Sequence, residues 1–148
     1  MAKRFPKSTL VQFNYVPTIH AQTALGHKDF RKAIEVLQAA APYELAALHF
    51  TAFAPALYPV YMRGEAYMAA HQGREAAAEF QKILDHRGIV LNEPIGALAH
   101  LGLARAYALK GDTAKAKAAY QDFLTLWKDA DPDIPVLLAA QSEYAKLQ

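Results

Sequence analysis

The stretch ARAYALKGDTAKAKAAYQDFL, residues 104–124, decides the fold. Its apolar residues recur at intervals of three and four, which places them on one face of an α-helix. Gly111 and Asp112 interrupt this pattern, because glycine ends a helix in the left-handed conformation and aspartate caps the next one. The core-facing positions after the turn are mostly alanine, which lets another helix come close. The stretch therefore predicts two closely packed helices joined by a tight turn.

The same spacing occurs three times along the chain. Five positions, separated by intervals of 3, 9, 4 and 3 residues, define each copy. They are Ala21, Ala24, Ala33, Leu37 and Ala40 in the first copy, Gly64, Tyr67, Ala76, Phe80 and Ile83 in the second, and Ala104, Tyr107, Ala116, Tyr120 and Phe123 in the third. Repetition of this kind predicts three helical hairpins whose packing these positions provide.

Each predicted first helix also has a proline near its beginning. These residues are Pro17, Pro59 and Pro94. Proline suits a first helical turn, since the N–H that it lacks would be unpaired there. Pro17 follows an apolar, helical-looking stretch, so the alternative at that place is a kink within a longer helix.

The pattern resembles the tetratricopeptide repeat (TPR). A small residue, an aromatic residue three positions later and an alanine that opens the second helix carry the resemblance, as in Ala104, Tyr107 and Ala116. The resemblance implies an all-α solenoid of helix-turn-helix hairpins with about 34 residues per repeat. Ala33 and Ala76 are 43 positions apart, and Ala76 and Ala116 are 40 apart. The repeats therefore carry insertions.

These features predict a single TPR-like domain over residues 1–148. Its expected parts are repeats at about 14–42, 57–88 and 94–128 and a capping helix at about 133–147, which a repeat array needs to cover its last apolar face. The apolar insert at 45–57 is expected to form an extra helical turn over the core or an interface. A second insertion contains DHRGIVLNEP, and the aspartates of DADPD (129–133) are expected to cap the last helix.

A more specific resemblance covers most of the chain. The stretches YVPTIHAQ, LYPVYMRGEAY and WKDADPDIP look like the C-terminal TPR region of bacterial eukaryotic-like serine/threonine protein kinases. This resemblance implies a fragment of a larger signalling protein in which a kinase domain precedes the repeats. It implies no kinase activity, because the sequence lacks a Gly-rich loop, a VAIK-type lysine, an HRD loop and a DFG motif.

Composition argues against several classes of function. The chain has no cysteine, which excludes disulfides, thiol nucleophiles and thiolate metal sites. Its 16 basic and 14 acidic residues leave a net charge of +2, so no nucleic acid or anionic lipid is expected as a partner. No run reaches the roughly 20 apolar residues that cross a bilayer, and the N-terminus lacks the apolar region of a signal peptide. We therefore expect no membrane insertion and a cytoplasmic location by default.

The outward face of the first helices predicts a concave groove that receives a peptide or a helix. Its members are Tyr15, Thr18 and Gln22 in the first repeat, Tyr58, Tyr61, Glu65 and Met68 in the second, and Leu101 and Arg105 in the third. Aromatic and methionine side chains would anchor the partner between Glu65 and Arg105. The alternative is that these residues pack on the capping helix or on the 45–57 insert.

No catalytic or metal-binding pattern stands out. None of the six histidines is paired at three- or four-residue spacing, and His20 and His100 are expected to pack or hydrogen-bond on their helices. Acidic residues such as Glu79 and Asp122 are expected to solubilise helix surfaces. We therefore predict a non-catalytic protein-interaction module without cofactor or metal. The alternative is self-association through Tyr58, Tyr61 and the insert; an enzyme with an unrecognised site is a weaker third.

Overall fold

The computed structural model describes residues 1–46 and 57–148, and all regular secondary structure in these ranges is helical. The chain is therefore all-α over its described part. The elements are η1 (Val11–Tyr15), α1 (Val16–Gly26), α2 (Phe30–Leu37), η2 (Gln38–Ala40), α3 (Tyr58–Ala69), α4 (Gly73–Asp85), α5 (Arg87–Val90), α6 (Ile95–Leu109), α7 (Thr113–Leu126) and α8 (Pro135–Ala145). The predicted insert lies almost wholly in 47–56, outside the described residues.

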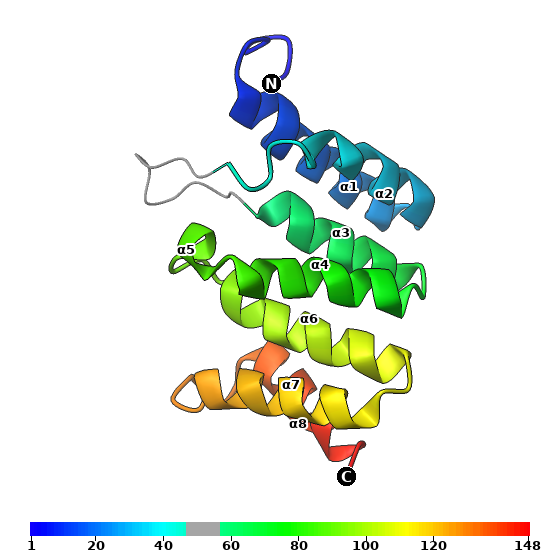
Figure 1. Cartoon of the computed structure of the whole chain (residues 1–148), viewed down its shortest axis with the longest axis vertical. Coiled ribbons are helices and arrows are strands. Elements are labelled where there is room, and N and C mark those ends of the chain that lie inside the picture. The colour runs from blue at the N-terminus through cyan, green and yellow to red at the C-terminus, as the bar shows by residue number, and fades with distance from the viewer. Residues whose placement is uncertain (47–56) are drawn as a thin grey trace.

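The helices follow one another in pairs along the long axis of the molecule (Figure 1). Within the pairs, α1 packs on α2, α3 on α4, and α6 on α7. Between the pairs, α2 contacts α3 and α4 contacts α6, so each second helix lies against the first helix of the next pair. Helix α8 packs on α7 and ends the stack. No helix among the described residues has the length and apolar character needed to cross a membrane.

The three turns inside the pairs share one geometry. In each, a backbone N–H bonds to the carbonyl oxygen five residues earlier: Asp29 to Ala24 at 2.9 Å, Gln72 to Tyr67 at 2.8 Å, and Asp112 to Tyr107 at 3.0 Å. The residue before that N–H has a positive φ in every case: 60° at Lys28, 58° at His71 and 77° at Gly111. The repeated sequence spacing therefore produces a repeated backbone turn.

The outcome for the predicted turn residues is mixed. Gly111 has the left-handed conformation, and the Asp112 side chain caps α7 by accepting a hydrogen bond from the Lys115 N–H at 3.3 Å, which confirms both predictions. Gly26 and Gly73 lie near the other two turns in the sequence, but neither has a positive φ. Lysine and histidine adopt the left-handed conformation at those turns instead, because the hydrogen bonds that close the turn fix the backbone there.

The prolines have two different environments. Pro59 lies in the first turn of α3, and Pro94 immediately precedes α6. Pro17 instead lies inside a continuous helical run, since the π-helix η1 leads directly into α1. Proline cannot bond to the carbonyl four residues earlier, and a wider π-turn is a common way to accommodate such a missing bond. The longer helix is therefore the alternative that the structure adopts at Pro17.

The buried residues form two clusters among the described part of the chain. Ala21, Ala33, Leu37 and Ala66 make a small cluster between the first pair and α3. The larger cluster runs from Leu57 through α3–α7 to Ala140 of α8. The alanines of the sequence pattern, Ala76 and Ala116 among them, are fully buried except Ala24, which is partly buried.

Phe80 of α4 is the centre of the larger cluster. A Cβ atom built at Gly64 of α3 would lie 2.8 Å from its ring, and one built at Gly102 of α6 would lie 2.6 Å away. Real side chains do not approach this closely, so both positions need glycine. The phenyl ring therefore fills the space between two glycine backbones, one in its own pair and one in the next.

Helix α8 begins differently from the prediction. Its N-cap residue is Ile134, which makes no side-chain capping bond, and Pro135 occupies the first turn. The expected cap from residues 129–133 is wrong, since proline already supplies a first turn with one fewer unpaired N–H. Leu137 and Ala140 are buried and hold the helix on the stack.

Candidate functional site

The N-terminal part of the predicted concave face is an open apolar hollow. Tyr15, Thr18 and Tyr58 line it together with Met1, Asn14 and Ile19, and its volume is about 330 Å³. The hydroxyl of Tyr58 donates a 3.1 Å hydrogen bond to Glu93, which with burial raises the pKa of this tyrosine. Gln22 is exposed. We call this surface the N-terminal hollow.

The C-terminal part of the same face is occupied by α8. Arg105 donates two hydrogen bonds to the carboxylate of Glu143, from Nε at 2.8 Å and from Nη2 at 2.9 Å, and the Tyr120 hydroxyl donates another at 2.8 Å. Burial raises the pKa of Glu143, but the bonds from Arg105 and Tyr120 outweigh it and leave the pKa low. Arg105 therefore packs on α8, which is the alternative that the sequence analysis considered for this face.

The middle of the predicted face is mostly closed. Leu101 is 1% exposed and belongs to the larger core cluster, because α6 is packed against α3, α4 and α7. It is not available to a partner, which corrects the prediction. The Tyr61 ring packs edge-on against Phe80 with 5.6 Å between ring centres, and Met68 packs on the same cluster. Burial raises the pKa of Glu65, although the nearby Arg105 opposes the shift.

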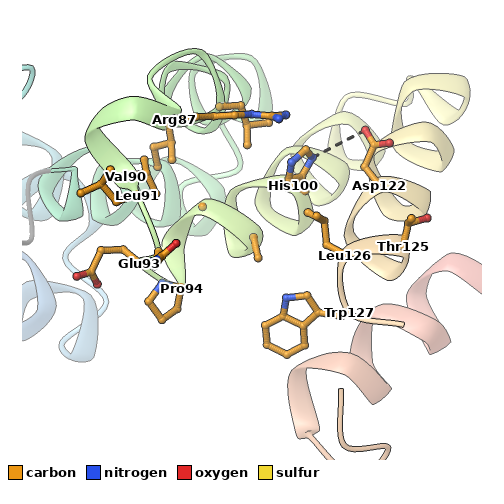
Figure 2. Close-up of a pocket in the computed structure, with 15 residues that line it drawn as sticks. Arg87, Val90, Leu91, Glu93, Pro94, His100, Asp122, Thr125, Leu126 and Trp127 are labelled. Carbon is orange, nitrogen blue, oxygen red and sulfur yellow. Dashed lines mark ion pairs between the residues drawn. The ribbon is translucent and has the colours of Figure 1, made fainter. Parts of the chain in front are cut away.

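A large cavity lies elsewhere, between the end of α4 with α5 on one side and the end of α7 on the other. We call it the α5–α7 groove. Its volume is about 730 Å³, and most of its surface is apolar. Figure 2 shows the side chains that line it, among them Arg87, Val90, Leu91, Pro94, His100, Asp122, Leu126 and Trp127. The second sequence insertion builds one of its walls, since α5 and the following turn lie within it.

The floor and lips of the groove differ in character. Gly96 and Ala97 of α6 line the floor, and a Cβ at Gly96 would lie 2.9 Å from Val90, so glycine allows α5 to lie close. The lips carry Leu91 and Leu126, which are 65% and 59% exposed. Leu91 also has φ 53° and ψ −123°, a conformation that costs a branched residue energy. Strained backbone thus presents an exposed leucine beside an apolar groove.

Three polar residues meet inside the groove. His100 Nδ1 lies 3.8 Å from Asp122 Oδ2, as the dashed line in Figure 2 marks. Burial lowers the pKa of His100; Asp122 opposes that shift, and Arg87 adds to it. The His100 side chain is 12% exposed and is packed, as expected, whereas His20, for which the same was expected, is exposed. Asp122 is exposed, as expected, but it also lines the groove and interacts with His100.

The groove has little of what catalysis needs. His100 and Asp122 are farther apart than a hydrogen bond, and the other carboxylate that lines the groove, Glu93, accepts a hydrogen bond from Tyr58. Within 1–46 and 57–148, no group of three or more His, Cys, Asp or Glu side chains is placed to hold a metal ion. Apolar walls with a few charged groups suit the binding of another molecule.

A buried ionic cluster was missed by the sequence reasoning. Arg63 of α3, whose side chain is 3% exposed, bonds to Glu44 at 2.9 Å, to Glu79 at 2.6 Å and to the Leu37 carbonyl at 3.3 Å. Lys82 completes the cluster with a 2.7 Å bond to Glu44. Burial opposes the charge of Arg63, but the two carboxylates outweigh it and raise its pKa. Glu79 is therefore part of a buried network and does not serve to solubilise α4.

Comparison with known proteins gives no relative from which a function can be taken: no protein family, no curated protein and no solved structure matches the chain. The site must be interpreted from its own geometry.

Proposed function

We propose that the chain is a non-catalytic protein-binding module, a TPR-like solenoid that scaffolds or regulates within a larger cytoplasmic signalling protein of the kinase-associated type. Three observations support it: the sequence spacing common to the three helix pairs, their common turn, and helix contacts made through alanine and glycine. Stacked helix pairs of this kind offer extended surfaces that other proteins occupy.

The α5–α7 groove carries the proposal as its binding site. Its volume of about 730 Å³ exceeds the 330 Å³ of the N-terminal hollow, and two exposed leucines border it. The groove predicted from sequence is a weaker candidate, because α8 already fills its Arg105 end. Apolar anchors that enter a groove supply most of the affinity in helix or peptide recognition.

Selection from a random library of 12-residue peptides tests this function. We expect enriched peptides to lose at least tenfold in affinity when Leu126→Asp places a charge on the groove lip. Leu138→Asp is the matched control, since Leu138 is 49% exposed on α8, outside the groove. Fluorescence anisotropy gives the affinities, and circular dichroism checks that both variants fold. Equal binding to all three proteins would contradict the proposed site.

Self-association is the second candidate function, and the N-terminal hollow favours it. The hollow is lined by apolar surface, and Ile19 at its edge is 53% exposed. Burial of such a patch against a second copy would remove it from water. Light scattering on the wild-type chain and on Ile19→Asp tests this: a dimer that becomes a monomer supports self-association, and a wild-type monomer removes it.

A further inference from the structure

The walls of the α5–α7 groove carry opposite charges. Arg87 stands on the α5 side, and Asp122 stands on the α7 side (Figure 2). Arg87 takes part in no ion pair or side-chain hydrogen bond recorded for the described residues, whereas the Glu93 carboxylate accepts its bond from Tyr58 on α3. Asp122 has only the 3.8 Å contact with His100, and its side chain is 66% exposed. Both wall charges are therefore open to an incoming group.

His100 lies between these two charges, and an apolar surface extends beside them (Figure 2). Val90 and Leu91 lie on the Arg87 side, and Leu126 with Trp127 lies on the Asp122 side. Gly96 and Ala97 on the floor add no bulk, so a side chain can enter between the walls. An apolar residue seated here would have one neighbour facing a positive group and another facing a negative group.

We propose that the groove binds a protein segment in which an apolar anchor side chain lies between an acidic residue directed at Arg87 and a basic residue directed at Asp122. The inference rests on the proposed function, and it adds the chemistry and the orientation of the partner. Complementary charges at an interface contribute mainly to specificity and register, whereas the apolar anchor contributes most of the affinity.

The electrostatics around His100 agree with an acidic group at this place. The charged groups that face it are Arg87 from α5 and Asp122 from α7, and burial together with Arg87 keeps its pKa low. A carboxylate bound at Arg87 would offset the positive field of the guanidinium. A basic group at Asp122 and the added burial would act in the opposite direction, so the charge exchanges, and not the pKa of His100, test the inference.

Charge exchange on the walls tests the proposal with the library used above. We expect peptides selected on the wild-type chain to combine an apolar residue with one acidic and one basic neighbour. The double variant Arg87→Glu/Asp122→Lys should bind the selected peptide at least threefold more weakly and its charge-reversed version more tightly. Arg74→Glu/Glu75→Lys is the matched control, because these exposed residues lie at the opposite end of α4.

The outcomes separate this inference from the proposed function. Reversed charge preference on the wall variant, with unchanged preference on the Arg74→Glu/Glu75→Lys control, supports the inference. Peptides that depend on Leu126 but ignore both charge exchanges overturn the inference and leave the binding site intact. A library that yields no peptide, or peptides indifferent to Leu126, overturns both.

Discussion

The contact between the first and second helix pairs, α2 against α3, differs from the contact between the second and third pairs, α4 against α6. Between the first pair and α3, the buried apolar cluster consists of only three alanines and Leu37, and the buried Arg63 cluster lies at the same joint. Between α4 and α6, the core is continuous and apolar, and the Phe80 ring fills the contact against Gly102. The α2–α3 contact therefore depends on buried charges, and we call it the ionic joint. The α4–α6 contact depends on the close approach of the Phe80 ring to the Gly102 backbone, and we call it the glycine joint.

This difference teaches that a repeated sequence pattern specifies each helix pair and leaves the joints free to vary. The Arg63 position is equivalent to Leu103 in the third repeat, which is an ordinary core residue. The ionic joint is destabilised when one of its charges is removed, because the remaining buried charges have then lost a partner. The glycine joint is destabilised when a side-chain atom is added at Gly102, because the Phe80 ring occupies that space.

Removal of the Arg63 charge is the strongest way to break the ionic joint. Arg63→Met leaves Glu44 and Glu79 with Lys82 alone, and their side chains are 5% and 13% exposed. Loss of one partner from a buried ion cluster costs about 3–5 kcal/mol of unfolding free energy. Urea denaturation measures it. Hydrogen exchange should show that α1 and α2 lose protection first, because their own cluster is small.

Further changes sharpen this result. Lys82→Met should cost less than Arg63→Met, since Lys82 is 31% exposed. Replacement of Glu44 and Glu79 by glutamine in the Arg63→Met background should recover part of the loss, because no unpaired carboxylate remains. A loss below about 1 kcal/mol for Arg63→Met, a value typical of surface pairs, would show that the ionic joint does not hold the first pair.

Gly102→Ala breaks the glycine joint, with the second-largest effect. The new methyl group would lie 2.6 Å from the Phe80 ring, and overpacking of this kind costs about 1–3 kcal/mol. Gly88→Ala in α5 is the matched control, because nothing lies within 4 Å of its Cβ position. That control should be neutral or stabilising. Chemical denaturation of both variants measures the difference in unfolding free energy. Adding Phe80→Leu to Gly102→Ala should recover part of the stability, because leucine leaves room for the new methyl group.

Much of the fold could be predicted from the sequence, because its determinants are local. Spacings of three, four and nine residues describe one hairpin, and most of the positions that they select, such as Ala76 and Ala116, are buried. The turn at Gly111 and Asp112 was predictable for the same reason. Assignment to the TPR class remains a prediction, since no comparison tests it.

The contacts between the helix pairs and the α5–α7 groove could not be predicted, because their residues are far apart in the chain. Arg63 lies 19 positions from Glu44 and 16 from Glu79, so no helical spacing connects them. Gly102 lies outside the five-position pattern, although the Phe80 ring requires it. The one usable signal for the α5–α7 groove was the insertion before Pro94, which lengthens the chain between α4 and α6 and builds a wall there.

The joint between the third pair and α8 is intermediate, and pH separates it from the Arg63 cluster. Arg105 and Glu143 are each about one-third exposed, so Arg105→Met should cost about 1 kcal/mol or less. The folded pKa of Glu143 lies below its ordinary value of 4.5. Its contribution is therefore present above pH 4.5 and is lost as the pH falls through the folded pKa. Melting curves of wild type and Glu143→Gln should converge at low pH; a constant gap would contradict the assignment.

The smallest expected effect on stability concerns His100, which lines the α5–α7 groove. Its folded pKa lies below the ordinary value of 6.5, since burial disfavours the charged ring. The unfolded chain therefore binds more protons, and folding stability is full above pH 6.5 and falls as the pH drops through the folded pKa. Wild type should lose stability relative to His100→Gln between pH 7.5 and 5.5, as measured by urea midpoints. An opposite slope would mean that Asp122 outweighs burial and Arg87, and the groove would then favour a charged imidazole before any partner arrives.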